Sequence, residues 1–119
     1  MGTADLLNYL QSRSGSYLRG AVQYDDGEND VLYLRGDVRE ERMLSEIDRM
    51  LARLKPESLA AEERSFPLGE LYVTVRRFET AIIMHFPRGK QRGIVVSLEP
   101  DAARNLNQFT TECIQQIDN

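Results

Sequence analysis

Few side chains in this sequence have the chemistry of a catalytic group. His85 is the only histidine, and it lies in the apolar run formed by residues 82–86. Because imidazole titrates near neutral pH, His85 is the natural candidate for a general acid or base. Histidine also occurs in protein cores. Since apolar residues flank His85 along its strand, we expect the core role here.

The single cysteine adds no second catalytic group. Cys113 falls on the apolar stripe of a predicted C-terminal helix, where a free thiol usually packs as a small hydrophobic residue. One cysteine cannot build an internal disulfide framework or a thiolate zinc cage. We can assemble no Ser-His-Asp or Cys-His arrangement from the sequence. We therefore expect a protein that is not an enzyme and that uses no cofactor.

Basic residues gather in one turn. Arg88, Lys90 and Arg92 stand within five residues of one another, beside two glycines that would leave backbone N–H groups approachable. Such a turn could bind a small anion, a phosphate, a nucleotide or an acidic partner surface. These three residues, together with His85, form our candidate anion site. The alternative is a polar hairpin tip whose charge keeps the protein soluble.

The charge of the chain is distributed unevenly. Residues 64–92 hold six basic and two acidic side chains, a net of +4, whereas the rest of the chain holds 9 basic and 17 acidic ones, a net of −8. The overall net charge of −4 argues against a dedicated nucleic-acid-binding protein. The sequence contains neither G-x-x-x-x-G-K-[ST] nor G-x-G-x-x-G, so the basic turn is not a phosphate loop of a known type.

A run of acidic residues precedes the second predicted strand. Asp25, Asp26, Glu28 and Asp30 carry the oxygen ligands that calcium prefers. The run lacks the length, glycine position and terminal glutamate of an EF-hand loop. We therefore expect a solvated hairpin tip and no metal site.

Apolar periodicity predicts the elements that position these residues. Spacings of three and four predict helices, and alternation predicts strands. The helices are expected at residues 3–10, 37–54 and 100–117, with Gly15 ending the first. The strands are expected at residues 17–24, 31–35, 70–78, 81–86 and 94–98. Turn formers at residues 25–30 predict a longer loop in the first hairpin.

This element order predicts an α+β fold, arranged α-β-β-α-β-β-β-α. Strands joined by short turns pair antiparallel. The two front strands and the three back strands can share one five-stranded sheet only if residues 37–54 form the long crossover. We expect residues 1–119 to form a single domain with the helices packed on the sheet.

Length and composition exclude several classes of protein. A chain of 119 residues, 41% of them hydrophobic and 29% charged, fits one globular domain. No apolar run approaches the roughly 20 residues of a membrane span, and the first residues lack a signal-peptide pattern. We therefore expect a protein without membrane contact.

Several phrases of the chain resemble a family of small haloarchaeal proteins of unknown function. They lie at residues 17–20, 31–35, 69–76, 85–89 and 96–103. The resemblance covers most of the chain from Tyr17 onward and implies a cytoplasmic archaeal protein, but it carries no activity. Thirteen arginines against two lysines agree with it.

The element order is also similar to that of the Roadblock/dynein-light-chain superfamily, a profilin-like sandwich of helices around a five-stranded sheet. This resemblance implies a regulatory homodimer in which the second helix and the third strand meet their copies. The candidate interface residues are then Met43, Ile47, Met50, Leu71, Val73 and Val75.

Two classes of function remain open. The first is a non-enzymatic interaction module that forms a homodimer and contacts another protein. The alternative is a sensor of small anions or nucleotides that uses the turn at residues 88–92.

Overall fold

The computed structural model describes the chain except for residues 1, 41–42, 55–66, 90, 104–105 and 119. Its elements, in chain order, are α1 (Gly2–Ser14), the 3-10 turn η1 (Gly15–Tyr17), β1 (Leu18–Asp25), β2 (Glu28–Leu34), α2 (Gly36–Glu40), α3 (Met43–Leu54), β3 (Thr74–Arg77), β4 (Ile82–Pro87), β5 (Arg92–Leu98), the 3-10 turn η2 (Pro100–Ala103) and α5 (Leu106–Asp118).

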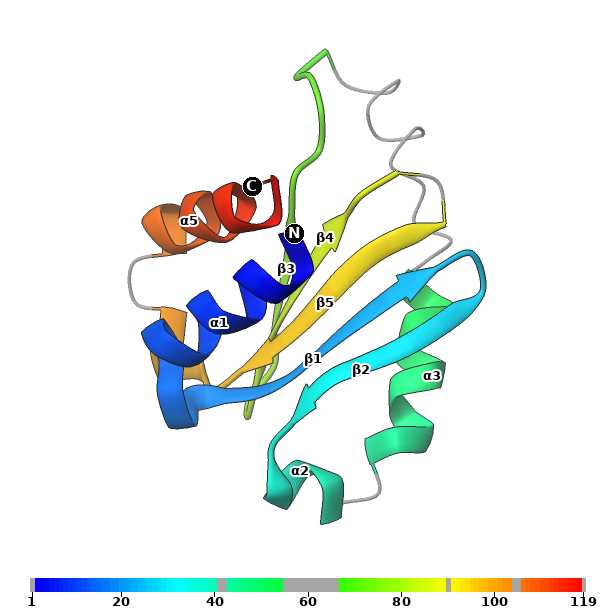
Figure 1. Cartoon of the computed structure of the whole chain (residues 1–119), viewed down its shortest axis with the longest axis vertical. Helices are drawn as coiled ribbons and strands as arrows, with labels where there is room; N and C mark the ends of the chain where they lie inside the picture. The colour runs from blue at the N-terminus through cyan, green and yellow to red at the C-terminus, as the bar shows by residue number, and fades with distance from the viewer. Residues whose placement is uncertain (1, 41–42, 55–66, 90, 104–105, 119) are drawn as a thin grey trace.

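The five strands form one sheet in the order β2-β1-β5-β4-β3, and every neighbouring pair is antiparallel. Helices α1 and α5 cover one face, whereas α2 and α3 lie on the opposite side (Figure 1). The predicted α+β class and the five-stranded antiparallel sheet are confirmed. The front hairpin and the back strands share one layer because β1 pairs with β5.

Both faces of the central strands are buried, and this explains why their sequences are almost entirely apolar. In β4, Ile82, Met84 and Phe86 join the core beneath α1 and α5, while Ile83 joins the core on the side of α2 and α3. Strand β5 divides in the same way. The first core contains Leu6, Leu10, Leu18, Ala21, Ile82, Met84, Phe86, Ile94, Val96, Leu98, Cys113 and Ile117, and the second contains Val22, Tyr24, Leu34, Val38, Leu51, Ile83 and Val95.

The first hairpin differs from the prediction. The prediction of a loop over residues 25–30 is wrong, because the two strands continue until Asp25 pairs with Glu28. The turn consists of Asp26 and Gly27, both with positive φ, 51° and 91°. Two positive φ angles are what a type I′ hairpin turn requires, and Asp-Gly is a preferred pair for it. The charged start of β2 is tolerated because its side chains are exposed.

Three other elements have boundaries that differ from the predicted ones. The helix predicted at residues 37–54 consists of two helices, α2 and α3, and residues 41–42 between them lie outside the described residues. The predicted strand at residues 70–78 is a strand only from Thr74 to Arg77. The C-terminal segment begins as the 3-10 turn η2, and α5 starts at Leu106. The first helix ends where expected, since Gly15 has a φ of +53°.

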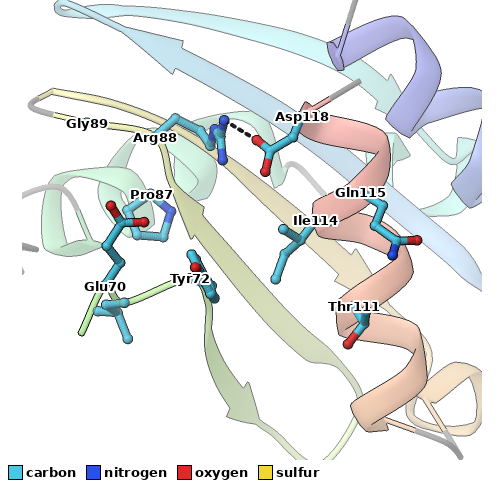
Figure 2. A pocket seen from close by; sticks show the side chains of 10 residues that line it. Glu70, Tyr72, Pro87, Arg88, Gly89, Thr111, Ile114, Gln115 and Asp118 are labelled. Carbon is cyan, nitrogen blue, oxygen red and sulfur yellow. Dashed lines mark ion pairs between the residues drawn. The ribbon is translucent and has the colours of Figure 1, made fainter. Parts of the chain in front are cut away.

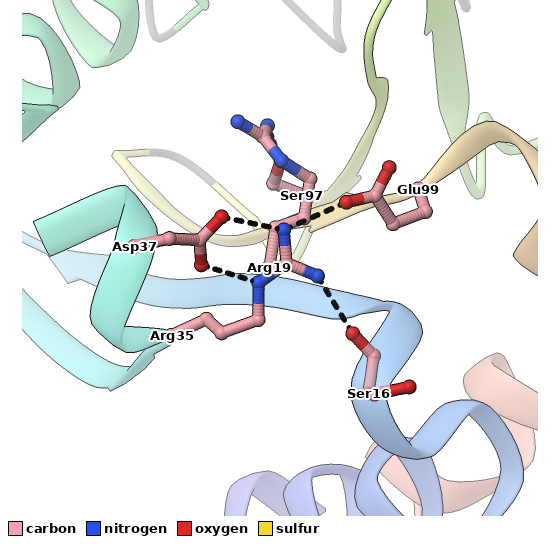
Figure 3. Close-up of polar contacts among 6 residues, drawn as sticks. All are labelled: Ser16, Arg19, Arg35, Asp37, Ser97 and Glu99. Carbon is pink, nitrogen blue, oxygen red and sulfur yellow. Dashed lines mark hydrogen bonds and ion pairs between the residues drawn. The ribbon is translucent and has the colours of Figure 1, made fainter. Parts of the chain in front are cut away.

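Arg35 ties together three segments at one end of the sheet (Figure 3). Its Nε donates to Oδ1 of Asp37 at 2.6 Å, Nη1 donates to the carbonyl of Ser16 at 2.6 Å, and Nη2 donates to Oε1 of Glu99 at 2.7 Å. A guanidinium has five donors in a fixed fork, so one side chain can bind all three acceptors. The end of β2 is thereby joined to η1 and to the segment after β5.

The Asp37 carboxylate should make stability depend on acid pH. The hydrogen bond from Arg35 holds the pKa of Asp37 below its ordinary value of 3.8 in the folded state. Such a carboxyl stabilises the fold fully above its unfolded pKa, and this contribution is lost as the pH falls through the folded pKa. We expect the urea midpoint of the unmodified protein to fall more steeply from about pH 5 to pH 2 than that of Asp37→Asn.

The control for this measurement is Asp101→Asn, which changes an exposed aspartate that lines a cleft beside Arg35. It should follow the unmodified protein. Equal acid slopes for the unmodified protein and Asp37→Asn would contradict the effect assigned to the hydrogen bond from Arg35.

Candidate functional site

The basic turn joins β4 to β5. The amide of Arg88 donates to the carbonyl of Arg92 at 2.9 Å, and two residues of the turn adopt positive φ, Gly89 at +119° and Gln91 at +65°. The amide of Asp26 donates to the carbonyl of Gln91 at 2.9 Å, so the turn is held against the tip of the first hairpin. Lys90, which belongs to the candidate anion site, lies outside the described residues.

The two described arginines of the turn each face a carboxylate. Arg88 forms an ion pair with Asp118 at the end of α5, and Nε of Arg92 lies 3.6 Å from Oδ1 of Asp25. Both arginines line one small cleft of about 190 Å³. The C-terminal end of a helix carries a partial negative charge, which adds to that of Asp118. Each of the two described arginines of the turn therefore lies beside a negative charge.

His85 lies in the core rather than among the arginines. Its side chain is 3% exposed, and its Nε2 is 2.6 Å from the hydroxyl oxygen of Tyr24, with which it forms a hydrogen bond. Tyr24 lines the cleft of the two arginines, whereas the lining of that cleft does not include His85. Burial raises the pKa of Tyr24, so its hydroxyl stays protonated at neutral pH.

Gly93 provides the space for this pair. A Cβ atom at this position would lie 2.4 Å from the Tyr24 hydroxyl oxygen and 2.6 Å from its Cζ. Gly93 is buried, and it lines the cleft of the two arginines together with Tyr24. Glycine is needed here because the ring of Tyr24 approaches the backbone of β5 closely.

Cys113 also lies in the core beneath α1 and α5. Burial raises the pKa of its thiol to about 12. The reactive form of cysteine is the thiolate, so the folded protein keeps this thiol unreactive near neutral pH.

The candidate interface residues fall into different environments. Val75 on β3 is 38% exposed. Leu71 and Val73 are half-buried, and Val73 packs against the core beneath α1 and α5. Met50 is half-buried against the other core. The side chains of Met43 and Ile47 lie outside the described residues.

A larger cleft opens between α5, the end of β4 and the extended segment before β3 (Figure 2). Its volume is about 600 Å³. The ion pair between Arg88 and Asp118 lies at one side, and Tyr72 and Ile114 face each other across it. The lining consists of Glu70, Leu71, Tyr72, Pro87, Arg88, Gly89, Thr111, Ile114, Gln115 and Asp118.

Most of the residues that line this cleft were not predicted from the sequence. Of its lining residues, only Arg88, Gly89 and Leu71 had been singled out, and Leu71 only as an interface residue. The alternation of residues 70–78 is the signal in the sequence that could have indicated it, because it places the ring of Tyr72 on the same strand face as Thr74 and Arg76. In the structure the Tyr72 side chain is 56% exposed, and a large exposed aromatic often marks a binding surface.

Comparison with known proteins finds a match to a family whose function is unknown. The model of a family described as a domain of unknown function (DUF7522) matches residues 4–118. No curated protein matches the sequence. Among the described residues, no three His, Cys, Asp or Glu side chains lie close enough together to hold a metal ion. No helix within the described ranges is long and apolar enough to cross a membrane.

The close approach of Tyr24 to Gly93 predicts a costly substitution. Gly93→Ala should destabilise the protein by about 1–3 kcal/mol, the usual cost of overpacking, because the added methyl group must displace the Tyr24 ring. Chemical unfolding measures the loss. The matched control is Gly36→Ala, where a Cβ meets nothing within 4 Å and no positive φ is required. Equal unfolding midpoints for the two variants would refute this account of Gly93.

Proposed function

The chain belongs to the DUF7522 family, whose description names no function, and we propose that this member is a non-enzymatic interaction module that works as a homodimer. The observation that carries the proposal is the sheet edge at β3, where Val75 is exposed. Within the described sheet, β3 pairs with β4 alone, so its other side presents backbone donors and acceptors to a further strand.

The two edges of the sheet differ in character. Strand β2 begins with charged residues, Glu28 and Asp30, which are exposed and discourage pairing with another strand. Strand β3 also carries charge, in Arg76 and Arg77, but its apolar Val75 is exposed and is followed by Phe78, which is 54% exposed. We therefore choose β3 as the edge for association.

A two-fold axis at Val75 gives a pairing of β3 with its copy that avoids repulsion. In an antiparallel pair on this axis, Val75 faces Val75, and Arg76 of each copy faces Thr74 of the other. Moving the axis to Arg76 would place two guanidinium groups directly opposite each other, which is unfavourable. A four-residue strand buries little area, so we expect a weak dimer unless flanking residues such as Phe78 join the interface.

The similarity to the Roadblock superfamily supports this arrangement, because it implies contacts through the helix and strand that correspond to α3 and β3. The described outer face of α3 is polar, with Asp48, Arg49 and Arg53 exposed. We therefore assign the larger part of the interface to β3. A second protein partner would bind the assembled dimer.

The burial of His85 and Cys113 supports a role without catalysis. The phrases similar to haloarchaeal proteins and the excess of arginine over lysine support a cytoplasmic archaeal location, which we include in the proposal.

A second candidate function is anion binding by the basic turn, and one observation favours it. Arg88 and Arg92 come from opposite ends of the turn yet line the same cleft. An anion would have to compete with Asp118 and Asp25 for these two side chains. We rank this function second for that reason.

The dimer is tested with two valines of similar exposure on the two edges of the sheet. Val75→Lys would place two lysines opposite each other on the axis, so the protein should become monomeric in light scattering coupled to size exclusion. Val31, which is 41% exposed on β2, provides the control, and Val31→Lys should leave the mass unchanged. A monomeric unmodified protein at high concentration, or equal effects of both substitutions, would contradict the proposal.

Anion binding is tested with inorganic phosphate. If the turn binds it, phosphate should raise the melting temperature of the unmodified protein, since a ligand that binds only the folded state stabilises that state. The variant carrying Arg88→Ser and Arg92→Ser should lose this increase and keep its fold. If phosphate still raised the melting temperature of this variant, the anion site would lie elsewhere in the protein.

A further inference from the structure

We propose that the cleft between α5, the end of β4 and residues 70–72 binds a small organic cation, an ammonium group carried on an apolar or aromatic body. This proposal goes beyond the homodimer and does not rest on it. A volume of about 600 Å³ lies within the usual range for small-molecule sites, about 300–1,000 Å³. The smaller cleft of the two arginines, about 190 Å³, falls below that range.

The apolar part of the ligand would lie against the hydrophobic walls. Ile114 projects from α5 toward Tyr72, which belongs to the extended segment before β3 (Figure 2). Pro87 at the end of β4 and Leu71 contribute further apolar surface. Aromatic and aliphatic walls of this kind bind hydrocarbon by excluding water, and they are the usual lining of small-molecule pockets.

The charges of the cleft favour a cation. Its lining holds two carboxylates, Glu70 and Asp118, and one guanidinium, that of Arg88. Because Arg88 is paired with Asp118, the carboxylate of Glu70 remains as the excess charge. The C-terminal end of α5 also lies here and adds its partial negative charge. The electrostatic surroundings thus have the opposite sign to the one that the basic turn suggested.

Tyr72 adds a second attraction for the same kind of ligand. Its ring is 56% exposed and lines the cleft. The face of an aromatic ring attracts an ammonium group through its quadrupole. Gln115 and Thr111 on α5 line the same cleft and bring further polar atoms to it. An anion of the same shape would meet Glu70 and the end of α5 instead, and would be repelled.

Three probes with similar bodies and different charges test the proposal: phenethylammonium, 3-phenylpropionate and 2-phenylethanol. Each is titrated into the full-length protein and followed by amide NMR spectra. Phenethylammonium should shift the resonances of Gly89, Ile114 and Gln115, and it should bind more tightly than the alcohol. Phenylpropionate should bind most weakly of the three.

Two exposed glutamates, one before β3 and one after it, supply a matched pair of variants. Glu70 lines the cleft, whereas Glu79 follows β3 and is not part of the lining; both are exposed, so neither substitution should affect folding. Glu70→Gln should weaken phenethylammonium binding about two- to five-fold, the usual effect of losing one exposed charge interaction. Glu79→Gln should leave the affinity unchanged.

Three results would overturn the proposal. The first is binding of phenylpropionate as tight as that of phenethylammonium. The second is an equal loss of affinity in Glu70→Gln and Glu79→Gln. The third is the absence of shifts at the cleft with every probe. Because Val75 lies outside the lining, the titration can be repeated with Val75→Lys, and its outcome is independent of the dimer.

Discussion

The pairing of β1 with β5 is the constraint on which the rest of the structure depends. It extends from Leu18 opposite Leu98 to Asp25 opposite Arg92 and joins the N-terminal hairpin to the C-terminal strands. The helices α2 and α3 lie in the chain between these two groups of strands, which gives the chain the length it needs to cross over. Without this pairing the sheet would divide into a three-stranded part and an isolated two-stranded hairpin, and such a hairpin is at best marginally stable in water. It also places α1 beside α5, where the Tyr9 hydroxyl donates to the Glu112 carboxylate. Burial, reinforced by Glu112, raises the pKa of Tyr9, so this donor keeps its proton.

The pattern of apolar residues was sufficient to predict the sheet, because its central strands are buried on both faces and are almost entirely apolar. The run from Ile82 to Phe86 has no other stable location than the middle of a sheet. The same reasoning failed at β2, whose first three residues are polar and exposed, since pairing with β1 rather than burial makes them a strand. It failed again before β3, where alternation continues to Glu70 but the ladder with β4 begins only at Thr74. Alternating residues predict a strand, but only a partner determines its length.

The candidate site was less predictable than the fold because its contacts join residues that are distant in the chain. Arg88, Lys90 and Arg92 are neighbours in sequence, and their spacing indicates a concentrated positive charge. Nothing in that spacing shows that Arg88 meets Asp118 or that Arg92 meets Asp25. Both contacts follow from the strand order, which brings the end of α5 and the first hairpin to the same turn. The role of Gly93 is hidden in the same way, because the tyrosine that requires it lies on β1. The arrangement of Tyr24, His85 and Gly93 illustrates that a buried polar pair requires space as well as a partner.

Folding brings acidic residues against part of the basic segment, and this affects how the surface can be used. Asp118 at the end of α5 and Asp25 of the first hairpin each lie against an arginine of the basic turn. Two surfaces among the described residues are available for recognition, the edge at β3 and the larger cleft. At β3 the exposed Val75 offers a site for the proposed strand pairing. At the cleft the excess carboxylate and the ring of Tyr72 offer selectivity for a cation.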